Sequence, residues 1–244
     1  MKRFCWRGES SVYKKEKWIK LGATALCEGF TVYTILSLFA GNEPDRLALA
    51  FGTILLVLLP MLAERLFSCR ICLPLYLFTL VYAIGPMLGH CWKLYYTLPW
   101  WDKLLHTSAG MIFAILGAYL FDLLAQEKQK PIVRILFAFC FSVTVSVLWE
   151  FAEFGADTFL GMDMQNDRVV SRITSYLLGQ TLGTTGSIHN IHSVVVNGII
   201  LPGYIDIGLH DSMLDMLLES LGALITCLLL FLDKNRHPLI RREK

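Results

Sequence analysis

Acidic side chains, with one histidine among them, recur at helical spacing in three separate parts of the chain. The three groups are Asp102 with His106; Glu150, Glu153 and Asp157; and Asp211, Asp215 and Glu219. Residues three or four positions apart lie on the same face of a helix. Each group is therefore predicted to line one face of one helix. Carboxylate oxygens and imidazole nitrogens are ligands of divalent metal ions.

The negative charge of so many carboxylates must be compensated, because like charges in a low-dielectric setting disfavour one another. The basic residue within these groups is Lys103, and its place next to Asp102 predicts a different helix face from that of Asp102 and His106. A divalent cation or shared protons are then the remaining sources of compensation. The predicted metal ligands are Asp102, His106, Glu150, Glu153, Asp157, Asp211 and Asp215. This ligand set suits Zn²⁺, Mn²⁺, Mg²⁺ or Fe²⁺ and leaves the choice among them open.

A metal bound in this way would lower the pKa of a coordinated water and supply a nucleophile for hydrolysis. A carboxylate not used as a ligand would then act as general base. Glu153 and Asp215 are the candidates for that catalytic role.

The same residues also fit roles that need no metal. Acids at helix ends are often solvated, and the helix dipole favours acids such as Asp102 and Asp211 near helix N-termini. The acids would also serve a cation- or proton-coupled transporter, since ionisable groups inside membranes often carry ions. Transport predicts a polar route to the other side, and apart from Asp122 the inner halves of the fourth and sixth predicted helices are largely apolar. A non-catalytic assembly protein is a third alternative.

Weaker motifs lie elsewhere in the chain. Cys69 and Cys72 form a lone CxxC, which without a second ligand pair is a weak metal or redox signal. His189 and His192 are candidates to complete a metal site, although loop histidines are usually solvated. His90 and His210 are expected near the same interface.

The composition is that of an integral membrane protein. Hydrophobic residues make up 55% of the 244 residues and charged residues 17%, and the mean hydropathy is +0.53, whereas soluble domains carry roughly 25% charged residues. The formal net charge of +2 gives no support to a nucleic-acid partner. The expected partner is the lipid bilayer, and the composition leaves the oligomeric state open.

Six segments are long and apolar enough to span a membrane, for which about 20 residues are needed. They cover approximately residues 18–40, 46–66, 71–92, 102–125, 131–158 and 209–232. The third is expected to be broken by Pro74, Gly85 and Pro86, which membrane helices tolerate when neighbours satisfy the freed backbone groups. The expected fold is an all-α, polytopic helix bundle.

The expected domains are a basic N-terminal tail (1–17), a membrane domain (18–232) and a basic C-terminal tail (233–244). The membrane domain includes a loop or cap over 161–208. Within this loop, residues 194–201 predict a strand, a hairpin or a re-entrant segment.

Lys and Arg residues indicate the orientation, because cytoplasmic flanks carry an excess of them. Most of the 22 lie in the two tails and in the second and fourth connections. Both termini are therefore expected in the cytoplasm of a multi-pass protein of a bacterial inner or plasma membrane. The three acidic groups then fall at the outer ends of their helices, and the predicted substrate is a lipid or lipid-linked molecule of the outer leaflet.

Four motifs resemble those of the YjdF-like family of inner-membrane proteins. They are Trp101-Asp102 to His106, Trp149-Glu150-Phe-Ala-Glu153, Gly161-Met-Asp-Met-Gln165 and Asp211-Ser-Met-Leu-Asp215. The resemblance covers residues 45 to 230 and implies a helical membrane bundle, but no established reaction. The stretch between Gln165 and Asp211 is longer than that family's pattern implies.

Overall fold

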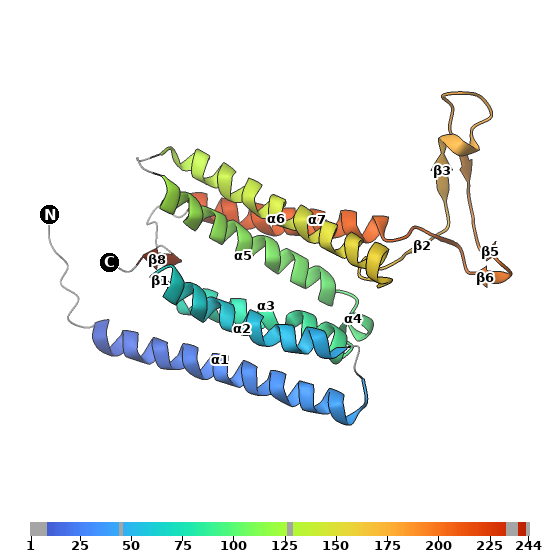
Figure 1. Ribbon diagram of the computed structural model, residues 1–244. Helices are drawn as coiled ribbons and strands as arrows, with labels where there is room; N and C mark the ends of the chain where they lie inside the picture. The colour runs from blue at the N-terminus through green and yellow to red at the C-terminus, as the bar shows by residue number, and fades with distance from the viewer. Residues whose placement is uncertain (1–8, 44–45, 126–128, 233–238, 243–244) are drawn as a thin grey trace. The chain divides into compact units, whose positions relative to one another are not determined.

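The computed structural model describes residues 9–43, 46–125, 129–232 and 239–242. It is mostly helical, with six long apolar helices and one short one (Figure 1). The helices are α1 (Glu9–Ala40), α2 (Leu47–Leu66), α3 (Leu73–Cys91), α4 (Leu94–Thr97), α5 (Trp101–Leu124), α6 (Pro131–Leu160) and α7 (Leu209–Leu232). This confirms the predicted fold class. Much of the two predicted tails, 1–8, 233–238 and 243–244, lies outside the described residues.

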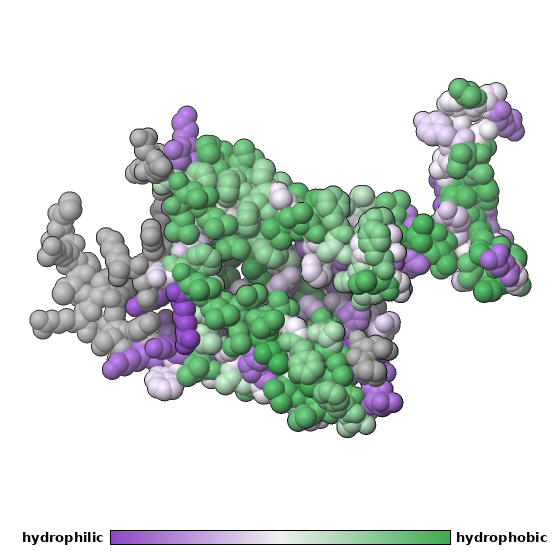
Figure 2. Space-filling model, in the orientation of Figure 1, coloured by the Kyte–Doolittle hydropathy of each residue, from purple (hydrophilic) through white to green (hydrophobic). Residues whose placement is uncertain are grey.

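The six long helices have the length and composition of membrane spans. The shortest, α3 (Leu73–Cys91), has 19 residues and the longest, α1 (Glu9–Ala40), has 32, against about 20 needed to cross the hydrocarbon core. Large aliphatic and aromatic side chains are exposed along them, including Leu55 and Leu136, and Figure 2 shows a largely hydrophobic helix surface. Such a surface suits contact with lipid tails.

Proline positions explain how α3 differs from its predicted form. Pro74 lies in the first turn of the helix, where its missing N–H is not needed. Pro86 lies inside the helix, which nevertheless continues from Leu73 to Cys91. The predicted break at Gly85 and Pro86 is absent, and the helix tolerates its interior proline as the sequence predicts.

The chain divides into two compact units. The bundle unit comprises residues 1–142 and 219–244, and the hairpin unit comprises Val143–Leu218. Helices α6 and α7 each contribute residues to both units.

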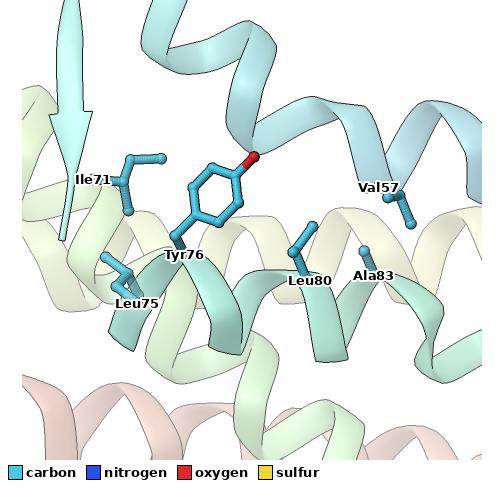
Figure 3. Close-up of a cluster of buried hydrophobic side chains, with 6 residues drawn as sticks. All are labelled: Val57, Ile71, Leu75, Tyr76, Leu80 and Ala83. Atoms are coloured by element: carbon cyan, nitrogen blue, oxygen red, sulfur yellow. The ribbon is translucent and has the colours of Figure 1, made fainter. Parts of the chain in front are cut away.

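Within the bundle unit, α1, α2 and α3 pack against one another around a buried apolar cluster. Tyr76 lies between Ile71 and Leu80 in this cluster (Figure 3). Its hydroxyl reaches α1, 2.8 Å from Thr24 Oγ1. The buried tyrosine therefore packs with its ring and satisfies its polar atom at a neighbouring helix.

A second cluster in the bundle unit joins α5, α6 and α7. It is built from small side chains: Ala114, Ala118, Ala138, Ala223 and Cys227. Small residues let helix backbones approach closely, which is how membrane helices gain packing energy in the absence of a hydrophobic driving force. The same close packing of α5 against α7 lies near the polar pair His106 and Glu219.

The bundle unit also contains a short sheet. Strand β1 (Cys69–Ile71) pairs antiparallel with β8 (Ile240–Arg242). Lys20 Nζ lies 2.5 Å from both Glu64 Oε1 and the carbonyl oxygen of Ile71, so this ion pair ties α1 and α2 to the strand.

The hairpin unit contains all the other strands. They are β2 (Val169–Val170), β3 (Ile173–Ser175), β4 (Gly186–Ile188), β5 (Val194–Val196), β6 (Ile199–Leu201) and β7 (Tyr204–Ile205). The antiparallel pairs are β2–β7, β3–β4 and β5–β6. Asn197 and Gly198 connect β5 to β6, both with positive φ, as a tight hairpin turn requires. Residues 194–201 thus form the hairpin, one of the three forms that the sequence leaves open.

Candidate metal centre

His106 lies between two carboxylates inside the bundle unit. Its Nε2 is 3.5 Å from Asp102 Oδ1, one turn earlier on α5, and its Nδ1 is 3.3 Å from Glu219 Oε1 on α7. His106 is 8% exposed and Glu219 5%. The imidazole is therefore buried with an acid at each ring nitrogen, as the spacing of Asp102 and His106 predicts for one half of this arrangement.

Lys103 corrects one prediction. Its ammonium lies 2.8 Å from Asp102 Oδ2, although adjacent helix positions predicted different faces. The four-carbon stem of lysine is long enough to bring the ammonium back to its neighbour. Asp102 thus has a basic partner on one oxygen and the imidazole near the other.

Two glycines set the distance between α5 and α7. A Cβ at Gly110 would overlap the carbonyl group of Glu219, and a Cβ at Gly222 would overlap the carbonyl oxygen of Thr107. Each glycine thus admits the backbone of the opposite helix. Since His106 lies one turn before Gly110, this close contact brings the Glu219 carboxylate to the imidazole.

Glu219 is the residue that the predicted ligand set leaves out. The signal for it is in the sequence, because Asp211, Asp215 and Glu219 follow one another at four-residue intervals. Its partner His106 is 113 positions away in the chain. The two meet because α5 and α7 pack closely at Gly110 and Gly222, which local spacing does not reveal.

The arrangement defines roles for the two ring nitrogens. A carboxylate at Nδ1 fixes the tautomer and raises the basicity of the other nitrogen, a pattern common behind metal-bound histidines. Nε2 and Asp102 Oδ1 lie on the other side of the ring from Glu219. Their separation of 3.5 Å is compatible with two ligands that each lie about 2.0–2.2 Å from one ion.

The hairpin unit holds a second set of buried acids. Glu150 is 5% exposed and Glu153 9%, on α6, and Trp149 Nε1 donates a hydrogen bond of 2.8 Å to Glu153 Oε1. The Lys and Arg residues of this fully described unit are Arg168 and Arg172, and both are exposed. Buried carboxylates are costly to ionise, so the charge state of Glu150 and Glu153 depends on the groups around them.

Asp157 and Asp211 hold the segment that follows α6. Both oxygens of Asp157 accept backbone N–H groups, from Met164 at 2.6 Å and from Gln165 at 2.9 Å. Asp211 Oδ2 accepts from the backbone and the side-chain amide of Asn166, each at 3.1 Å. These bonds give both acids a structural role, and a role for them as metal ligands stays a prediction.

Two glycines with positive φ shape the same segment. Gly161 (φ 64°) follows the last residue of α6, and Gly208 (φ 80°) precedes α7. A Cβ at Gly208 would meet the backbone and side chain of Gln165, whose side-chain nitrogen lies 2.5 Å from Ser212 Oγ. Residues 161–165 therefore contact both the end of α6 and the start of α7. They form one of the motifs that carry the family resemblance.

Asp215 is the most buried of the predicted ligands, at 2% exposed. It lies on the continuous helix α7, one turn before Glu219. Burial of Asp215, Asp211, Glu150 and Glu153 is at odds with the alternative of solvated helix ends. That the acids of the hairpin unit share one site with Asp102 and His106 stays a prediction.

The other histidines have separate surroundings. His189 and His192 are exposed. His210 lies 2.6 Å from Asp206 through Nδ1, and the ring of His90 packs edge-on against Tyr95. Of the CxxC pair, Cys69 is buried and Cys72 half-buried, and no disulfide joins them.

Asp206 has a pKa below its ordinary value of 3.8. Partial burial alone would raise the pKa, but the backbone N–H groups of Arg168 and His210 and the His210 side chain stabilise the ionised carboxylate. Asp163 differs, since burial first and then the nearby Asp167, Asp157 and Asp211 raise its pKa.

Comparison with known proteins places the chain in a family. A family model described as "Predicted membrane protein (DUF2238)" matches residues 23–236. No curated protein and no solved structure matches the chain significantly.

Proposed function

The chain belongs to the predicted membrane protein family DUF2238, and we propose that within the membrane it binds a divalent metal ion through Asp102, His106 and Asp215. The observation that carries the proposal is the buried His106 imidazole, held by Glu219 at Nδ1 and next to Asp102 at Nε2. Asp102, His106 and Asp215 provide a carboxylate, an imidazole and a second carboxylate, a donor set of the kind that holds a metal ion.

Continuity of α7 supports the inclusion of Asp215. Asp215 and Glu219 are four positions apart, so both side chains project from the same face of one helix. Both are also buried. A face that presents Glu219 to the imidazole thus carries a second carboxylate one turn away.

We further propose that the bound ion serves hydrolysis of a lipid or lipid-linked substrate. A divalent ion would activate a water and polarise the bond to be broken. Because Asp215 is a ligand in this arrangement, Glu153 is the candidate that remains for general base. Trp149 supports Glu153 in this role, because its N–H fixes one oxygen of the carboxylate. Burial of the acids in a membrane protein favours a substrate delivered from the bilayer.

The hydrolase proposal is tested with purified protein in lipid nanodiscs. Water-soluble headgroup released from a panel of phospholipids and lipid diphosphates is measured with and without added Zn²⁺, Mn²⁺ or Mg²⁺. We expect metal-dependent release, and a loss of about 10²- to 10⁴-fold in rate when the general base is removed. Glu153→Gln should stop turnover while the metal-dependent thermal shift persists, whereas Asp215→Asn should weaken both. Metal binding without release of any headgroup would support the metal site but contradict the proposed hydrolase activity.

A second candidate function rests on the same imidazole. A protonated His106 would bridge Asp102 and Glu219 without a metal, as a proton relay does. Against it, the acid nearer the other end of α5, Asp122, is paired with Arg134 at 2.7 and 2.8 Å. Proton uptake by proteoliposomes after a pH jump, lost in His106→Gln, would favour the relay over the hydrolase.

The resemblance to the YjdF-like family is a finer proposal than the family match. It is supported by Trp149-Glu150-Phe-Ala-Glu153 and by Gly161–Gln165, the segment that Asp157 and Gly208 hold in place.

A further inference from the structure

Between Arg172 and Asp206 the chain contains no Asp, Glu, Lys or Arg. These residues, 173–205, are called the uncharged segment below. They include β3 to β7 of the hairpin unit and lie outside the predicted spans. Protein surfaces in water typically carry about 25–35% charged residues, so this surface is unusual for an aqueous environment.

Large apolar side chains stand exposed on the uncharged segment. In the connection between β3 and β4, Leu177 is 95% exposed, Leu182 106% and Tyr176 72%. Figure 2 shows hydrophobic side chains on this part of the hairpin unit. Exposed apolar surface of this kind marks an interaction site rather than a solvated loop.

The β5–β6 hairpin is apolar on both faces. Val195 pairs with Ile200, and the next pair, Val196 with Ile199, points to the opposite face. All four side chains are exposed. A protein partner docked on one face would leave the other face in water, whereas a lipid interface surrounds both.

The uncharged segment lies in the connection between two long apolar helices, α6, which ends at Leu160, and α7, which begins at Leu209, and this keeps it near the bilayer. The residues from Leu201 to Leu209, where α7 begins, reach at most about 28 Å when fully extended. Lipid is therefore always within reach of the hairpin. Tyr176 also has the amphipathic ring that favours the interface between headgroups and acyl chains.

We propose that the uncharged segment lies in the lipid interface of the bilayer, with Leu177, Leu182 and the β5–β6 hairpin in contact with lipid. A two-stranded hairpin has unpaired backbone groups along its edges, which the hydrocarbon core would not satisfy. The interfacial zone supplies water and headgroups to these edges. The uncharged segment contains none of the proposed metal ligands Asp102, His106 and Asp215, so its contact with lipid does not depend on the metal site.

The test is photocrosslinking of the full-length protein. Benzoylphenylalanine replaces Leu177 or Leu182 singly, positions where full exposure makes the substitution harmless to packing. Benzoylphenylalanine at exposed Arg172 is the matched control. The protein is irradiated in nanodiscs of phosphatidylcholine with phosphatidylglycerol and in native membranes, and adducts are identified by mass spectrometry.

We expect lipid adducts at positions 177 and 182 at about tenfold the yield of position 172, given the preference of an apolar side chain for lipid over water. The same yields are expected in a His106→Gln background, since the segment does not depend on the metal. Equal yields at all three positions would overturn the proposal. Crosslinks mainly to a second copy, or in native membranes to another protein, would also overturn it and identify a protein interface instead.

Discussion

At the scale of single residues, His106 is the most informative side chain. A buried imidazole with a carboxylate 3.3 Å from Nδ1 and another 3.5 Å from Nε2 has a fixed orientation. Glu219 contacts Nδ1, and Asp102 lies beside Nε2, the nitrogen proposed to bind the ion. The two acids are therefore expected to affect metal affinity differently. Loss of Asp102 would remove a proposed ligand, whereas loss of Glu219 would weaken binding by His106.

Glu219→Gln tests this division of roles. The amide keeps the shape of the side chain but loses the charge that raises the basicity of the imidazole, so metal affinity is expected to fall about 10- to 100-fold. Isothermal titration of metal-stripped protein with Zn²⁺ or Mn²⁺ measures the change. Asp122→Asn on α5 is the control. Asp122 pairs with Arg134, so this substitution should leave metal affinity unchanged. An unaltered affinity in Glu219→Gln would contradict the orienting role.

At the scale of elements, the contact between α5 and α7 positions the site. Gly110 faces the backbone of Glu219 and Gly222 faces that of Thr107, so neither glycine has room for a methyl group. The obstacle at both positions is backbone, which cannot rotate out of the way as a side chain does.

Gly110→Ala is expected to force α5 and α7 apart, at a cost of about 1–3 kcal/mol. The thermal unfolding midpoint in detergent should fall, and metal affinity should fall with it. Gly52→Ala on α2 is the matched control, since no atom lies within 4 Å of a Cβ there. Equal midpoints for the two variants would show that the close contact does not exist in the folded protein.

Asp206 gives the start of α7 a pH dependence. Its pKa is below the ordinary 3.8 because backbone and side-chain donors stabilise the carboxylate. The depressed pKa means that the stabilisation is fully present above about pH 4 and is lost as the pH falls through the folded-state pKa.

Hydrogen exchange at the backbone amides of Arg168 and His210, which donate to Asp206, should therefore gain relative protection from pH 3 to pH 5 after correction for the intrinsic rate. In Asp206→Asn this dependence should disappear. Persistence of the same dependence in the variant would assign it to another acid.

At the scale of the whole molecule, hydropathy predicts the fold well, and the site less completely. The six spans and the shared face of Asp102 and His106 follow from local spacing, whereas the hairpin at Asn197-Gly198 is one of three forms that the sequence leaves open. Glu219 is missing from the predicted ligands and Lys103 was assigned incorrectly, because their places depend on a contact between distant helices and on the bend of a flexible side chain. The structural use of Asp157 and Asp211 in holding residues 164–166 is likewise a tertiary feature.

The presence of a metal ion is the central claim, and elemental analysis of the purified protein tests it most directly. After removal of loosely bound ions, the wild-type protein is expected to contain about one divalent ion per chain, since a site of deprotonated, preorganised ligands retains its metal. His106→Gln should contain less than about a tenth of that amount. Metal-free wild-type protein that shows no thermal shift with Zn²⁺, Mn²⁺, Fe²⁺ or Mg²⁺ would contradict the account.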